Sequence, residues 1–116
     1  MGFKDLEVVQ VRSGGIKTFA FEFVETLSSS GNGDWLLIPD DMTGISVTVQ
    51  AGGGATAKVQ TTIDPLAVVK SGTGITAVDW DYGEVSSPTQ DYALPVTAIR
   101  LVQVGAGTSK MTIRCQ

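Results

Sequence analysis

The stretch that decides the fold is ISVTVQAGGGATAKVQTT, residues 45–62, whose first six residues alternate strictly between apolar and polar. One face of this expected strand carries the apolar residues Ile45, Val47 and Val49. The AGGG sequence at 51–54 indicates a hairpin connection, because glycine adopts turn conformations at little cost. The returning strand over 55–62 has an outer face rich in threonine, lysine and glutamine. A period of two around a glycine turn predicts antiparallel β structure.

The same period recurs along most of the chain. Further strands are expected at 7–12, 18–25, 35–38, 75–82, 92–94, 98–104 and 110–114. Phe19, Phe21 and Phe23 share one face and are expected to form a main block of the core. The continuous apolar run at 35–38 predicts a strand that is buried on both faces. The last two strands are expected to form a terminal hairpin through the glycine-rich turn at 105–108.

Eight or nine short antiparallel strands with frequent turns predict an all-β fold, most simply a jelly-roll-like β-sandwich. A closed β-barrel is the competing architecture. The one helical turn is expected over 64–72, with Asp64 as its cap and Pro65 at its first position. The 116 residues suit a single domain, 1–116, in which residues 1–6 form an N-terminal arm.

The composition excludes several classes of function. The chain has no histidine, so the commonest general base and the commonest metal ligand are both missing. Its single cysteine, Cys115, cannot form an intrachain disulfide and is expected to be an inert thiol. The net charge of −4 argues against broad binding to nucleic acid. No apolar run is long enough for a membrane helix, and the first residues lack the pattern of a signal peptide.

Two groups of side chains merit consideration as chemical sites. Asp79, Asp81 and Glu84 have oxygen ligands suited to calcium, but the calcium-loop pattern is incomplete, and a solvated or interfacial role is favoured. Trp80 and Tyr82 are expected on one strand face, where they form a stacking platform for sugars or, more simply, pack into the core. We therefore expect a protein that is not an enzyme, with no catalytic, cofactor-binding or metal-binding residue assigned.

The expected outer faces of the strands carry mostly threonine, serine, glutamine and valine. Charged residues make up only 17% of the chain, below the roughly 25% of an average soluble domain. Neutral faces protect a free monomer poorly against association, whereas the centres of protein interfaces are depleted of charge. This pattern favours a protein whose faces or edges are covered by partners.

The last two thirds of the chain resemble small virion proteins of tailed bacteriophages, several of which are capsid decoration, or cement, proteins with β-sandwich folds. The resemblance covers about residues 45–116 and rests on four segments and a dipeptide. These are the hairpin at 46–62, VDWDYGEV at 78–85, Gln90-Asp91, PVTAIR at 95–100 and KMTIR at 110–114. None of these segments is a catalytic motif.

The resemblance implies a capsid decoration protein that binds the outer surface of the phage head and stabilises contacts between major capsid subunits. The partner is then the major capsid protein, and the protein itself is a dimer or trimer. It would be made in the host cytoplasm and located on the virion, with no nucleic-acid or membrane partner. The alternatives are a tail, neck or head-fibre component and, more distantly, a carbohydrate-binding module that uses Trp80 and Tyr82.

Contacts with the capsid are expected in three places. These are the N-terminal arm, the polar loop at 28–34 and the loop at 86–90. The residues assigned to capsid contact are Met1, Gly2, Phe3, Lys4, Ser29, Asn32, Ser87 and Gln90.

Overall fold

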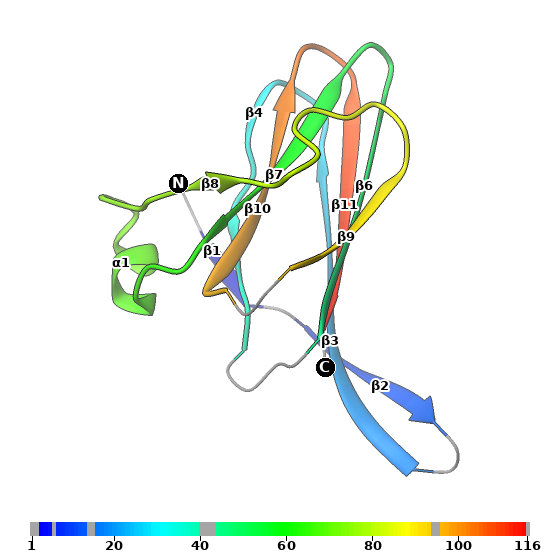
Figure 1. The fold of residues 1–116 in the computed structure, drawn as a ribbon, viewed down its shortest axis with the longest axis vertical. Helices are drawn as coiled ribbons and strands as arrows, with labels where there is room; N and C mark the ends of the chain where they lie inside the picture. The colour runs from blue at the N-terminus through cyan, green and yellow to red at the C-terminus, as the bar shows by residue number, and fades with distance from the viewer. Residues whose placement is uncertain (1–2, 6, 14–15, 40–43, 94–95, 116) are drawn as a thin grey trace.

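The chain folds into two β-sheets that face each other, as the computed structural model in Figure 1 shows. The structure describes residues 3–5, 7–13, 16–39, 44–93 and 96–115. Side chains are described within 22–39, 44–91 and 96–115. Two separate sheets, each with its own edge strands, make a sandwich rather than the closed barrel that the sequence left open.

Each sheet has a central path of five strands. The first sheet runs in the order β1 (Phe3–Asp5), β5 (Trp35–Leu37), β10 (Ala98–Val104), β7 (Thr56–Thr62) and β8 (Val78–Asp79), with β4 (Gly31–Asn32) also paired to β10. The second sheet runs in the order β2 (Glu7–Ser13), β3 (Ile16–Leu27), β11 (Thr108–Cys115), β6 (Ile45–Gly52) and β9 (Thr89–Ala93).

The strand order is that of a jelly roll. Numbering the eight strands β3 and β5 to β11 from one to eight along the chain gives the order 1-8-3-6 in the second sheet and 2-7-4-5 in the first. The chain therefore crosses between the sheets at almost every step, as in the double Greek key of jelly rolls. Nine of the described strands have three residues or more, and β4 and β8 are two-residue pieces. All described pairings are antiparallel except that of β1 with β5.

The period-two pattern of the sequence is confirmed in the middle of both sheets. In β6 the residues Ile45, Val47 and Val49 are buried, while Thr48 and Gln50 are exposed. These apolar side chains meet those of β7, β10 and β11 between the sheets. The main core consists of Leu36, Ile45, Val47, Val49, Ala51, Ala57, Val59, Trp80, Ile99, Leu101, Met111, Ile113 and Cys115.

The two glycine-rich hairpins differ from the prediction in the partners of their strands. β6 and β7 follow each other across residues 53–55 but lie in different sheets, and so do β10 and β11. β10 pairs with β4, β5 and β7, whereas β11 pairs with β3 and β6. Each glycine turn therefore makes a corner of the sandwich, which lets both strands place their apolar faces in the same core.

Strand β3 is long and belongs to the sandwich only in part. Residues 21–27 pair with β11, whereas residues 16–20 pair only with residues 9–13 of β2. These two segments form a two-stranded extension, here called the β2–β3 ribbon, which projects beyond the body of the sandwich (Figure 1). Phe23 packs against the main core as expected. The side chains of Phe19 and Phe21 lie outside the described side chains.

A second, smaller cluster lies under the helix α1 (Leu66–Ser71), where Val69 packs with Trp35, Leu37 and Ala98. The prediction for strand β5 is thereby confirmed, because its three residues are buried, with Leu36 in the main core. The prediction that Asp64 caps the helix is wrong: the N-cap is Pro65, and the Asp64 carboxylate accepts the Thr76 N–H at 2.6 Å. Within the described residues, no helix has the length and apolar character needed to cross a membrane.

Candidate functional site

Four uncharged turns meet at one end of the sandwich. They comprise residues 28–32, 52–54, 86–88 and 105–107, and together they are called the loop end. Their proximity follows from printed contacts: β4 pairs with β10 in register Gly31 to Gln103, and Ala57 at the start of β7 bridges to Val85. The corner turns of the two sheets also touch, since Gly53 adjoins Gly107 and Gly54 adjoins Ala106. Figure 1 shows these turns gathered opposite the β2–β3 ribbon.

Gln103 fixes the shape of the loop end from inside. Its side chain is 1% exposed and donates hydrogen bonds from Nε2 to the carbonyl oxygens of Gly105 (3.1 Å) and Gly107 (2.8 Å). Its Oε1 accepts the buried Ser109 hydroxyl at 2.6 Å. Its backbone oxygen accepts the Ser30 hydroxyl at 3.3 Å, so one residue connects the turn at 105–107 with the loop at 28–32. Sequence analysis missed Gln103, whose only signal was a polar residue among the apolar residues Leu101, Val102 and Val104.

Close packing of backbone against backbone also holds the loop end. Gly107 has a φ of +141°, and a Cβ built on it would overlap the carbonyl oxygen of Gly52 and lie 2.9 Å from the backbone nitrogen of Ala55. A side chain at this position would push the two corner turns apart. The loop end is therefore braced where the turns at 52–54 and 105–107 meet.

The loop end has little electrostatic character. None of its four turns contains a charged residue, and the adjacent Glu84 has its Oε1 bonded to the Thr56 hydroxyl at 2.9 Å. Neutral, rigid polar groups suit close contact with another protein, because no charge has to lose its water on contact.

The residues predicted to contact a capsid are only partly brought together. Ser29, Asn32 and Ser87 are exposed at the loop end, the first two beside β10 and the third in the turn before β9. Gln90 lies farther along, in β9, where its Nε2 donates to the Ser46 hydroxyl at 3.0 Å.

The N-terminal arm is not a free segment, because residues 3–5 form strand β1. Phe3 and Lys4 belong to β1, whose backbone pairs in parallel with Trp35 and Leu36 of β5. Residues 3–5 thus extend the first sheet because β5 otherwise has an open edge on that side. Met1, Gly2 and Leu6 lie outside the described residues.

Trp80 packs into the core, which was the simpler of the two expectations, and does not form a flat platform with Tyr82. The strand predicted over 75–82 is reduced to Val78–Asp79, because the chain turns at Gly83, whose φ is +62° and whose N–H donates to the Trp80 oxygen at 3.3 Å. Trp80 is 9% exposed, and its indole N–H donates to the Gly83 oxygen at 2.6 Å. Tyr82 is exposed and meets Trp80 edge-on at 77°. One ring of the pair is thus a core residue, which does not favour a sugar-stacking site.

The carboxylates of the 79–84 segment are engaged separately. Asp79 accepts hydrogen bonds from Gln60 (2.8 Å) and Lys58 (3.2 Å), and these two interactions, in that order, lower its pKa. Glu84 is bonded to Thr56, as described above. Among the described side chains, no three or more metal-ligating residues gather in one group.

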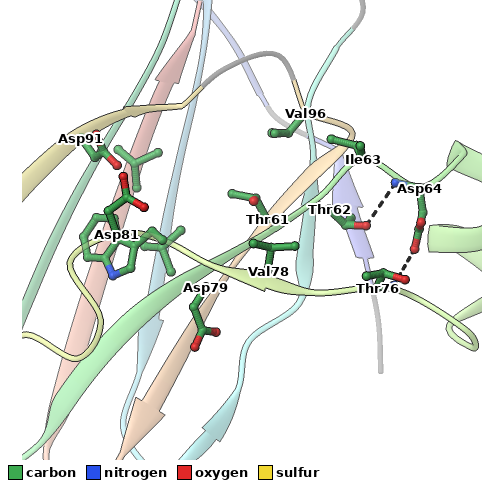
Figure 2. Close-up of a pocket in the computed structure, with 13 residues that line it drawn as sticks. Thr61, Thr62, Ile63, Asp64, Thr76, Val78, Asp79, Asp81, Asp91 and Val96 are labelled. Carbon is green, nitrogen blue, oxygen red and sulfur yellow. Dashed lines mark hydrogen bonds between the residues drawn. The ribbon is translucent and has the colours of Figure 1, made fainter.

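A cleft of about 690 Å³ opens between the edge strands β8 and β9, where the two sheets separate. Its walls are mostly apolar and include Val47, Val59, Ile63, Val78 and Val96. Figure 2 shows Asp81 and Asp91 directed toward each other at one end and Asp64 at the other. Sequence analysis did not anticipate this cleft, because Asp81 and Asp91 come from different segments that only the topology brings together.

Cys115 is buried at the end of β11, and burial raises the pKa of its thiol. A buried thiol with a raised pKa has little thiolate, which is the reactive form. We expect a thiol-specific disulfide reagent at about pH 8 to leave the native protein unmodified over a period in which the denatured protein reacts completely. Rapid reaction of the native protein would show that the end of β11 opens readily.

The sequence was also compared with known proteins. No protein-family profile matches the chain, and no curated protein matches it.

Proposed function

We propose that the protein is a bacteriophage capsid decoration protein that applies its loop end to the outer surface of the head. In this position it contacts adjacent major capsid subunits and stabilises the junction between them. The observation that carries the proposal is the loop end itself, an uncharged surface of four turns, two of which are held by Gln103. The resemblance of residues 45–116 to phage virion proteins supplies the identity of the partner.

Two physical properties of the loop end favour binding: its turns are already ordered, and they carry no charge that must lose its water. Association costs free energy for ordering loops, and this cost is smaller when the contacting turns are already fixed. The turn at 105–107 is held by two hydrogen bonds from Gln103, and the turn at 52–54 packs directly against it. Because these turns are uncharged, docking them removes no ionised side chain from water. A weak contact of this kind, repeated over a shell, adds buried area at every junction.

Arginine substitutions at the loop end test this proposal. Ser29→Arg and Ser87→Arg each place a charge at an exposed position that the proposal buries, and we expect binding to expanded heads that lack the protein to weaken by about tenfold or more. The measurement is co-sedimentation of purified protein with such heads over a range of concentrations. Ala67→Arg is the matched control, because it adds the same charge on the exposed side of α1.

Two results would count against the proposal in different ways. Full binding by both loop-end variants would show that another surface meets the shell. No saturable binding by the unmodified protein would remove the decoration function itself.

A further inference from the structure

We infer that strand β2 of one copy docks on the open edge of β9 in a second copy, which brings the β2–β3 ribbon alongside the cleft beside β9. This assigns the cleft one occupant, a second copy of this chain. The inference concerns self-assembly, and it goes beyond attachment to a capsid.

The first support is the arrangement of edges. β2 and β9 are the two ends of the same sheet, and within the described part of the chain neither pairs with a further strand on its outer side. A two-stranded ribbon is marginally stable in water, and an open strand edge is a template for another strand. Joining the β2 edge of one copy to the β9 edge of the next continues the sheet from copy to copy through main-chain hydrogen bonds.

The second support is charge complementarity. Four aspartates line the cleft, Asp64, Asp79, Asp81 and Asp91. Asp79 is ion-paired with Lys58, and none of the residues that line the cleft is a lysine or arginine. The β2–β3 ribbon, 9–13 and 16–20, has the opposite balance: Arg12 and Lys17 are cross-strand partners, and neither segment contains an acidic residue. In a chain with a net charge of −4, this places a basic projection and an acidic cleft at different parts of one molecule.

The third support is the apolar character of the cleft. Ile63 and Val78 at the cleft are 78% and 56% exposed, although large apolar side chains are more stable when covered. A strand docked on the β9 edge would cover part of this cleft, whose volume is about 690 Å³.

A contact between two different surfaces is heterologous. Repeating it forms a closed ring if the rotation between neighbouring copies brings the last copy into contact with the first, and an open filament if it does not. We expect analytical ultracentrifugation of the isolated protein to show a closed oligomer that dissociates on dilution. Arg12→Glu and Asp81→Lys are each expected to shift the protein to the mass of one chain. Combining the two reversals in one chain, or mixing the two single variants, is expected to restore the oligomer.

Glu84→Lys is the matched control, since it reverses a nearby exposed carboxylate that does not line the cleft, and it is expected to leave the oligomer intact. Thermal unfolding of each variant verifies that the sandwich remains folded. A monomer at all concentrations, or an oligomer that survives Asp81→Lys, would overturn the inference. If Arg12→Glu dissociated the oligomer and Asp81→Lys did not, the contact would instead be a symmetric one between two β2 strands. The capsid is absent from this experiment. A negative result would therefore exclude the self-association and would not test binding of the loop end to the capsid.

Discussion

Replacing Gly107 by alanine is expected to lower the free energy of unfolding by about 3–5 kcal/mol, a large part of the total stability of a domain this size. Two effects add. A φ of +141° is unfavourable for any residue with a Cβ, and that Cβ would also overlap the backbone of the neighbouring corner turn at Gly52 and Ala55. The measurement is equilibrium unfolding in urea, monitored by tryptophan fluorescence.

Gly31→Ala separates the two effects. Gly31 has a nearly identical φ of +145°, but nothing lies within 4 Å of a Cβ built on it. This variant is expected to lose only the conformational part, about 1–3 kcal/mol. If both variants were equally destabilised, the contact between the corner turns would have no energetic weight and the loop end would not be braced as described.

Replacing Gln103 by leucine is expected to destabilise the protein by about 2–4 kcal/mol, although leucine has a similar size and suits a buried position. The substitution leaves the buried Ser109 hydroxyl without its acceptor and removes both hydrogen bonds to the turn at 105–107. Urea unfolding measures the loss, and amide hydrogen exchange at 105–107 is expected to become faster because the turn is released.

Gln50→Leu is the control for this experiment, since Gln50 is exposed on β6 and the substitution is expected to change stability by less than about 0.5 kcal/mol. Adding Ser109→Ala to Gln103→Leu removes the stranded hydroxyl and is expected to recover part of the loss. A Gln103→Leu protein as stable as the unmodified one would contradict the role assigned to this side chain.

The alternation of residues along the chain predicts most of the strands and the sandwich, but not the partner of each strand. In β6 the buried residues are those that the sequence indicates, because side-chain direction depends only on the local period of two. Whether β6 pairs with β7 or faces it across the core is decided by tertiary packing, and the same alternation satisfies both. The glycine turns at 52–54 and 105–107 were therefore recognised as turns and misassigned as hairpins within one sheet.

The candidate site, too, is predictable from the sequence only in part. The polar loops containing Ser29 and Ser87 are recognisable from composition, because serine, glycine and asparagine favour turns. The role of Gln103 depends on carbonyl oxygens that come within reach only when the 105–107 turn has its native shape. The cleft also depends on topology, since Asp81 follows β8 in one sheet and Asp91 lies in β9 of the other. No local sequence pattern predicts contacts between residues that are this far apart in the chain.

We propose that the protein covers a phage head, and the number of copies in each virion tests this proposal. Quantitative mass spectrometry of purified virions gives this number relative to the major capsid protein. The decoration function predicts a ratio near one-half or one per capsid subunit. A few copies per particle would contradict it and place the protein in the tail or neck, and absence from the virion would exclude every structural role proposed for it there.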